Sequence, residues 1–179
     1  YYFTPDKLEA YKDGNFLNVG IVFADAVTTV SNTYADEIKT PFYGEGLDGL
    51  LRARSNSLRG IVNGIDYNDF NPETDINLSA RYNATTFRKE KVKNKIQLQK
   101  DLGLEQDPKA MMIGIVSRLT DQKGFDLIAY IMDELCQDSV QIVALGTGDE
   151  RYENMFRHFD WKYHGKVSAQ IYYDESMSH

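Results

Sequence analysis

The sequence has little cysteine, and its histidines are few and scattered. Cys136 is its single cysteine, which excludes an internal disulfide framework and any zinc site built from several cysteines. The three histidines, at positions 158, 164 and 179, lack the spacing of a metal-binding motif. We therefore expect no bound metal, and the scarcity of cysteine favours a reducing, cytoplasmic setting.

The sequence also has fewer positive than negative charges and no long apolar run. The chain has 20 Lys and Arg against 27 Asp and Glu, a net charge of −7, which argues against nucleic acid as a partner held by bulk charge. No apolar stretch approaches the roughly 20 residues needed to cross a bilayer, so we expect no membrane partner. The 42% of hydrophobic residues nevertheless suffices to fill a core.

Two well-known nucleotide-binding motifs are missing. No Gly-x4-Gly-Lys-Ser/Thr run is present, which excludes a P-loop NTPase. Gly146 and Gly148 begin a dinucleotide fingerprint, but Arg151 stands where its third glycine belongs, so an NAD site is not expected. The chain also opens at Tyr1 without an initiator methionine, and we therefore expect it to be a piece of a longer protein.

Short elements are predicted in the first third of the chain. A capping box formed by Thr33 and Asp36 should open one of the helices. A minimal strand is predicted at residues 61–62, and the stretch at 66–75 should be extended and act as a linker. The other predicted elements are helices over residues 16–24, 33–39 and 47–53 and a strand over 26–30.

The rest of the chain has the pattern of an α/β fold with a Rossmann-like parallel sheet. A charged helix over residues 87–102 should bury Val92, Ile96, Leu98 and Leu102. Five elements then alternate as strand, helix, strand, helix and strand, which implies right-handed crossovers between parallel strands. They are predicted at residues 111–116, 125–135, 140–145, 150–159 and 167–172.

The loop at residues 117–124 is the strongest candidate site. Ligands of open α/β sheets bind at the carboxyl ends of the strands, beside helix N-termini that carry partial positive charge. Arg118 offers a planar fork of donors and Lys123 a mobile point charge, and together they suit a diphosphate. The alternative is that Arg118 caps a carbonyl group and Lys123 is merely solvated.

Three further residues follow predicted strands. The amide of Asn63 could reach a sugar hydroxyl, although an Asn-Gly pair more often shapes a turn. Tyr173 could stack on a base, although an aromatic residue at a strand end more often belongs to the core or rim. Gly148 would let a ligand approach the backbone closely, although a plain turn explains it equally well.

Several segments in order resemble bacterial glycogen synthases and plant starch synthases. The run Ser-Arg-Leu-Thr-Asp-Gln-Lys-Gly is highly specific for that family, and the likeness covers nearly the whole chain. The matching segments are residues 30–38, 46–52, 60–66, 71–75, 91–98, 116–124, 145–149 and 173–179.

This resemblance implies a retaining glycosyltransferase of the GT-B fold, with two Rossmann-like domains facing a cleft. Its substrates would be ADP-glucose, with ADP as product, and the non-reducing end of an α-1,4-glucan, with no further cofactor. By position, Arg118 and Lys123 resemble the pair that holds the diphosphate. Asn63 matches a residue near the donor sugar, Tyr173 one that packs on adenine, and Gly148 part of the loop beside the nucleotide.

The chain also departs from the family pattern. The Lys-x-Gly-Gly-Leu donor loop, a histidine of the N-terminal domain and the Glu-Pro-Cys-Gly segment are missing. The resemblance makes residues 1–60 the end of the N-terminal domain and 61–179 the linker and first part of the nucleotide-binding domain. We therefore expect weak ADP binding, no glucose transfer by the chain alone, and self-association through an open sheet edge.

Two other functions stay open. A related glycosyltransferase could use another nucleotide sugar, which a comparison of ADP-glucose and UDP-glucose affinity would reveal. A noncatalytic module could instead bind a nucleotide or a glucan to regulate or dock it.

Overall fold

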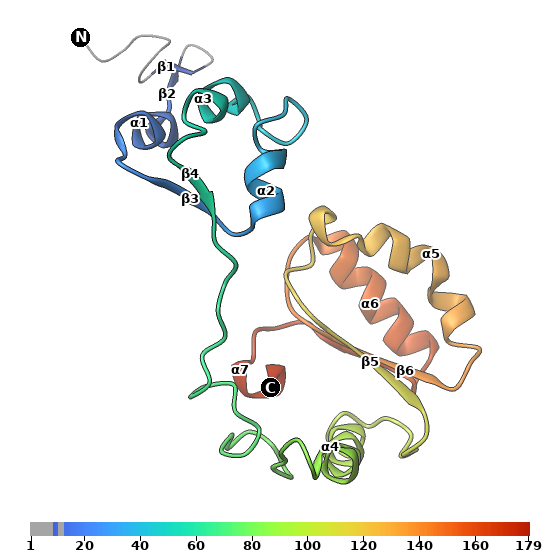
Figure 1. The fold of residues 1–179 in the computed structure, drawn as a ribbon. Coiled ribbons are helices and arrows are strands. Elements are labelled where there is room, and N and C mark those ends of the chain that lie inside the picture. The colour runs from blue at the N-terminus through green and yellow to red at the C-terminus, as the bar shows by residue number, and fades with distance from the viewer. Residues whose placement is uncertain (1–8, 11–12) are drawn as a thin grey trace. The chain divides into compact units, whose positions relative to one another are not determined.

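The computed structural model describes residues 9–10 and 13–179, which form two compact units. The first unit ends at Ile65, and the second comprises Asp66–His179. Each unit has its own hydrophobic core. Figure 1 shows the order of the elements along the chain.

The first unit contains a two-stranded parallel sheet, β3–β4, with short helices around it. A separate two-stranded antiparallel sheet joins β1 and β2. The predicted helices and the strand over residues 26–30 are confirmed, with each end within two residues of its expected place. The elements are β1 (Glu9–Ala10), β2 (Asp13–Gly14), α1 (Phe16–Phe23), β3 (Val27–Thr29), α2 (Asn32–Glu37), α3 (Asp48–Ala53) and β4 (Leu58–Gly60).

The strand predicted at residues 61–62 is wrong, because the chain pairs three residues earlier. Leu58 lies in register with Val27 and is buried in the core of this unit. Gly60 lies against the backbone at Ser31, where a Cβ atom would overlap main-chain atoms. Residues 61–62 are exposed. The burial of Leu58 and the close approach at Gly60 therefore set the register of β4, whereas the apolar character of residues 61–62 does not.

The N-cap residue of helix α2 is Ser31, two positions before the predicted Thr33. The Oγ atom of Ser31 accepts a hydrogen bond from the backbone N–H of Tyr34 at 2.9 Å. Ser31 has the extended backbone of an N-cap residue, whereas Thr33 already lies within the helix. Ser31 is therefore the residue that satisfies the first free N–H groups of the helix.

Two arginines of this unit cap helix ends. Arg52 donates to the carbonyl oxygen of Lys39, after α2, at 2.7 Å and also pairs with Asp48. Arg54 donates to the carbonyl oxygen of Ala24, directly after α1. Cations at helix C-termini satisfy free carbonyl groups and offset the helix dipole, so these arginines have a structural role.

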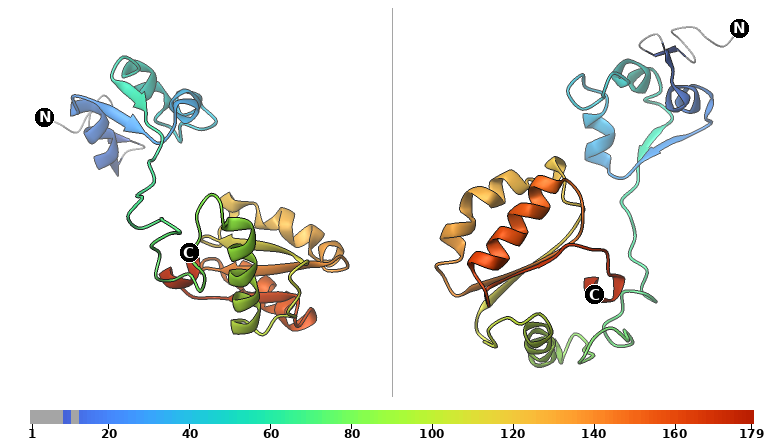
Figure 2. Two further views of the ribbon diagram at one scale, coloured as in Figure 1. Left: turned by 60° about the horizontal axis from the view of Figure 1, so that its bottom comes forward. Right: turned by 180° about the vertical axis from the view of Figure 1, so that it is seen from behind.

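The second unit is a three-stranded parallel sheet with the strand order β5-β6-β7. Helices α5 and α6 cover one face of this sheet, and α4 lies on its other side (Figures 1 and 2). This arrangement confirms the predicted Rossmann-like α/β fold. The elements are α4 (Phe87–Asp101), β5 (Met111–Val116), the 3-10 turn η1 (Asp121–Lys123), α5 (Phe125–Leu135), β6 (Val140–Leu145), α6 (Glu150–Lys162), β7 (Val167–Gln170) and α7 (Glu175–Ser178).

The bounds of β5, α5 and β6 agree with the prediction to the residue. Helix α6 continues three residues beyond its predicted end, because its last turn is tied to α5. Asp133 of α5 accepts hydrogen bonds from the Lys162 ammonium at 2.6 Å and from the Tyr163 hydroxyl at 2.7 Å. Strand β7 ends at Gln170, two residues before its predicted end.

The core of the second unit lies between the sheet and the two helices α5 and α6. Its members are almost completely enclosed, so each gains close to the full transfer free energy of its side chain. They include Leu119, Phe125, Met132, Ile142, Phe156 and Val167. The thiol of Cys136 belongs to the same core.

Cys136 is expected to be inert in the folded protein. Burial raises the pKa of its thiol, and the thiolate is the reactive form. We expect Ellman's reagent to react with native chain at least about 100-fold more slowly than with urea-unfolded chain, because access requires local opening. Native and unfolded rates within tenfold of each other would contradict this assignment.

Helix α4 buries its predicted apolar face only in part. Val92 is exposed, Ile96, Leu98 and Leu102 are half-buried, and Gln99 is the fully buried residue of the helix. The Gln99 amide donates to the Gln141 side-chain oxygen at 2.6 Å and to the Asp107 carbonyl oxygen at 2.9 Å. The Gln141 amide donates in turn to the Glu105 carbonyl oxygen at 2.6 Å. A polar pair thus joins α4 to β6.

Candidate functional site at the carboxyl edge of the sheet

The carboxyl ends of β5, β6 and β7 lie at one edge of the sheet, because the strands are parallel and adjacent. The loops at residues 117–124 and 146–149 and the segment after β7 leave from this edge. Four predicted site residues belong to these segments: Arg118, Lys123, Gly148 and Tyr173. Asn63 belongs to the first unit instead, where it is exposed and outside any helix or strand.

The two strand-to-helix loops are bonded to each other. An isolated parallel bridge joins Leu119 to Gly148. The N–H of Leu119 donates to the Thr147 carbonyl oxygen at 2.9 Å, and the N–H of Asp149 donates to the Leu119 carbonyl oxygen at 2.7 Å. Leu119 is fully buried beneath this junction. The loops therefore continue the β5–β6 pairing beyond the strands, and main-chain hydrogen bonds hold the two loops together.

Both glycines of the second loop are required by this junction. A Cβ atom on Gly146 would overlap the carbonyl oxygen of Ser117, and one on Gly148 would overlap that of Leu119. The N–H of Gly148 donates to a carboxylate oxygen of Glu153 at 3.0 Å. Contact with the neighbouring loop is thus sufficient reason for these glycines, and ligand binding by Gly148 stays a prediction.

Arg118 and Lys123 flank the tight turn that begins helix α5. The N–H of Lys123 donates to the Thr120 carbonyl oxygen at 3.0 Å, and Gly124 has a left-handed backbone, with φ of 70°. Both cationic side chains are exposed. Within residues 9–10 and 13–179, neither side chain makes a hydrogen bond or an ion pair. This finding is against the alternative in which Arg118 caps a carbonyl group.

Other charges of the same edge are already paired. Asp121 accepts hydrogen bonds from the Tyr152 hydroxyl at 2.5 Å and from the Arg151 guanidinium. Arg151 also lies 3.9 Å from a carboxylate oxygen of Asp149 and stacks over the ring of Tyr152. The Tyr152 hydroxyl, followed by Arg151, lowers the pKa of the Asp121 carboxyl. Arg118 and Lys123 are therefore left available for an anion from outside.

Tyr173 is also available for a ligand. Tyr173 is 82% exposed and lies in the segment after β7. The neighbouring Tyr172 hydroxyl instead donates to the Gln170 side chain at 2.8 Å, and Asp174 caps helix α7 by accepting from the Met177 N–H. Tyr173 thus stands between two engaged residues, and its stacking role stays a prediction.

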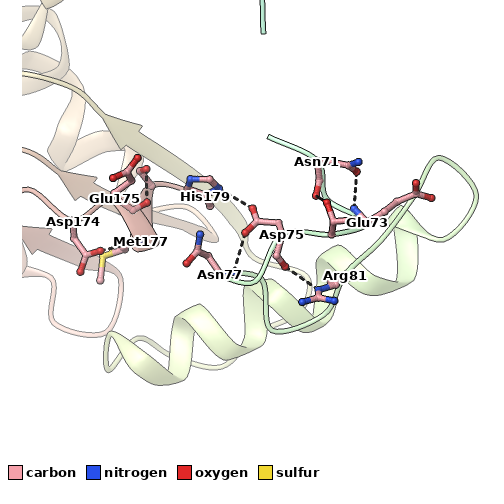
Figure 3. A network of polar contacts seen from close by, with 11 residues as sticks. Asn71, Glu73, Asp75, Asn77, Arg81, Asp174, Glu175, Met177 and His179 are labelled. Carbon is pink, nitrogen blue, oxygen red and sulfur yellow. Dashed lines mark hydrogen bonds and ion pairs between the residues drawn. The ribbon is translucent and has the colours of Figure 1, made fainter. Parts of the chain in front are cut away.

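A second polar cluster, which was not predicted, surrounds His179. The Nδ1 atom of His179 lies 2.7 Å from a carboxylate oxygen of Asp75, and both side chains are more than 90% buried (Figure 3). The His179 ring stacks on Phe70 at 5.1 Å. A polar cavity of about 450 Å³ adjoins this pair. A contact between residues 104 positions apart has no local signature.

Because the Asp75 carboxylate is paired in the folded chain, we expect the free energy of unfolding to fall in acid. The N–H of Asn77 and then His179 lower its pKa from 3.8, so its stabilising effect is complete above the unfolded pKa and is lost as the pH falls through the lowered folded-state pKa. We expect Asp75→Asn to be less stable than wild type at pH 7, with the difference shrinking at pH 3. Urea unfolding at both pH values measures this, with the exposed Asp69→Asn as control. An equal difference at both values would contradict it.

The described part of the chain lacks two other kinds of site. No group of three or more metal-ligating side chains comes together among residues 13–179. None of the described helices combines the length and the apolar character of a bilayer span.

The Rossmann-like α/β fold matches part of a GT-B structure, and the sequence matches known proteins. Residues 1–53 match the family described as "Starch synthase catalytic domain". The chain is 70% identical over 178 residues to a glycogen synthase of Lachnospira eligens, covering 99% of this chain and 37% of that protein. It is 60% identical over 179 residues to one of Lachnoclostridium phytofermentans, covering 100% and 37%.

A solved structure shows the same similarity. The catalytic domain of starch synthase IV from Arabidopsis thaliana, bound to ADP and acarbose, superposes with a TM-score of 0.91 at 34% identity. The match covers 99% of this chain and 37% of that one. The chain therefore matches glycogen and starch synthases over nearly its whole length, and it spans about 37% of the length of these relatives.

Proposed function

We propose that the full-length protein containing this chain transfers glucose from ADP-glucose to the non-reducing end of an α-1,4-glucan, with retention of configuration. The similarity to glycogen synthases supports this proposal, as does the complex of the Arabidopsis relative with ADP and acarbose. The observation that carries it is the pair of exposed, unpaired cations, Arg118 and Lys123, at the carboxyl edge of the sheet.

The chemistry assigns these cations a role in the transition state. As the glycosidic bond to the donor glucose breaks, negative charge grows on the departing phosphate of ADP. A guanidinium and an ammonium that are already in place stabilise that charge more than they stabilise the uncleaved donor. Because folding has already held both cations apart from internal anions, little has to rearrange when the charge develops.

The remaining predicted residues complete the nucleotide site. Tyr173, exposed after β7, would pack on the adenine ring. Gly148 would lie beside the nucleotide, and Asn63 near the donor sugar. Residues 1–60 would be the end of the N-terminal domain and residues 61–179 the linker and start of the nucleotide-binding domain. The division of the chain into compact units at Ile65 and Asp66 supports a boundary in this stretch.

A transfer assay tests this function. Full-length protein supplied with labelled ADP-glucose and glycogen should incorporate glucose, and the 179-residue chain alone should not, since it lacks the segments named above. Preference for UDP-glucose would instead favour a related glycosyltransferase. Nucleotide or glucan binding without any transfer by the full-length protein would favour a noncatalytic module, and turnover by the chain alone would contradict its proposed inactivity.

The chain alone is expected to self-associate through the free edge of β5. Among the described residues β5 pairs only with β6, and Met111 and Val116 are more than half exposed. A cavity of about 850 Å³, lined partly by Met111, Met112 and Met177, adjoins this edge. Unpaired edges with apolar side chains recruit other strands. Light scattering should show mass rising with concentration, and a monomer throughout would contradict this.

A further inference from the structure

Asp121 ties the cation-bearing loop to helix α6. The loop contributes Asp121, and the first turn of α6 contributes Arg151 and Tyr152. The Tyr152 hydroxyl donates to Asp121 at 2.5 Å, and the Arg151 guanidinium donates to the same carboxylate oxygen. Tyr152 is itself only 5% exposed and packs on Phe125, the first residue of α5. The loop is thereby anchored to a buried side chain.

This anchor lies between the two unpaired cations in the sequence. Asp121 is three residues after Arg118 and two before Lys123, within the turn that leads into α5. A free carboxylate there could pair with either cation, and a free Arg151 could compete for the same anionic ligand. Because Asp121 and Arg151 bind each other, both competing interactions are suppressed.

We propose that Asp121 and Tyr152 are positioning residues for the diphosphate site, holding the loop so that Arg118 and Lys123 face a ligand unpaired. The proposal rests on the proposed function, since the ligand is the diphosphate of ADP or ADP-glucose. Asp121 touches no reacting atom in this account and acts through its neighbours.

Removal of the Asp121 side chain should change the affinity for an anionic ligand in opposite directions, depending on whether Asp121 acts only through its charge or by positioning the loop. A carboxylate about 10 Å from a bound anion repels it, so deleting the negative charge alone would tighten binding about twofold or more. If Asp121 instead positions the loop, deleting its side chain weakens the binding of an anion although a repulsive charge has gone. Weaker binding therefore identifies positioning.

The chain offers a matched control at the opposite end of the same two helices. Asp133 of α5 accepts from Lys162 and from the hydroxyl of Tyr163, again one cation and one tyrosine. It lies roughly 12 Å along α5 from the first residue of the helix, away from the carboxyl edge. Asp133→Ala removes an equivalent tie without touching the loop.

NMR titration of the 179-residue chain with ADP tests the proposal. Asp121→Ala should weaken ADP binding about 5- to 10-fold and Tyr152→Phe about 3-fold, while Asp133→Ala stays within twofold of wild type. Asp121→Asn keeps an oxygen that accepts both hydrogen bonds, so it should restore affinity to within about twofold of wild type. Unchanged or tighter binding by Asp121→Ala would overturn the proposal.

A second readout does not depend on ligand. Backbone amide exchange of residues 118–124 should rise at least about tenfold in Asp121→Ala and not in Asp133→Ala. If wild-type chain binds no ADP, the proposed nucleotide site fails, and this exchange measurement still decides whether Asp121 holds the loop. Equal exchange in Asp121→Ala and wild type would overturn the positioning role by itself.

Discussion

Replacing Arg118 by alanine in the full-length protein is expected to reduce kcat for glucose transfer about 100- to 1,000-fold. The guanidinium is exposed and unpaired, in the loop that leads from β5 into α5, where it can bind the charge that develops on the leaving phosphate. Removal of one preorganised donor to a developing anion typically has this effect in other enzymes. Initial rates at saturating ADP-glucose measure it.

The split between kcat and KM shows whether Arg118 acts as proposed. A loss confined to kcat indicates stabilisation of the transition state alone, whereas a rise in KM with constant kcat indicates uniform binding. Arg118→Lys should recover only part of the activity, since an ammonium cannot donate two parallel hydrogen bonds. Arg88→Ala, an exposed arginine on α4, is the control. A rate within threefold of wild type for Arg118→Ala would contradict the account.

Replacing Gly148 by alanine is expected to destabilise the second unit by about 3 kcal/mol. The new Cβ would overlap the Leu119 carbonyl oxygen, so the loops must separate. Overpacking of this kind costs about 1–3 kcal/mol, and the hydrogen bonds between the loops at 2.9 and 2.7 Å would be strained or lost at about 1 kcal/mol each.

Urea unfolding of the 179-residue chain measures this loss. Gly114→Ala in strand β5 is the matched control, because nothing lies within 4 Å of the Cβ that it adds, and it should unfold within about 0.5 kcal/mol of wild type. ADP binding should weaken in Gly148→Ala and not in Gly114→Ala, since the displaced loop carries Arg118. Equal stability of the two variants would show that the loops are not held as described.

The sheet of the second unit was predictable because its signals are local. Strand β5 is a continuous apolar run and β6 is apolar except for Gln141, and glycine or acidic residues mark where the helices after them begin, so their bounds follow from the sequence. Strand β4 was misplaced because its register depends on the distant Val27 and on the space beside Ser31. Neither feature is visible in residues 58–62 themselves.

The candidate site also has parts that could be predicted from the sequence and parts that could not. Arg118 and Lys123 could be found from their spacing in one loop. The tie between Asp121 and Tyr152 spans 31 residues, and the one between Asp75 and His179 spans 104. Such contacts exist only after the sheet has formed. Glycines 146 and 148 were recognised as a loop signal, but their reason, contact with the other loop, depends on the same tertiary structure.

The central claim is that Arg118 and Lys123 bind the diphosphate, and a comparison of ADP with AMP tests it most directly. Calorimetry or NMR titration of the chain should show ADP binding at least about 10-fold more tightly than AMP, the size expected for charge-assisted hydrogen bonds. In Arg118→Ala/Lys123→Ala this ratio should fall to about one. A ratio that is unchanged in the double variant would contradict the account.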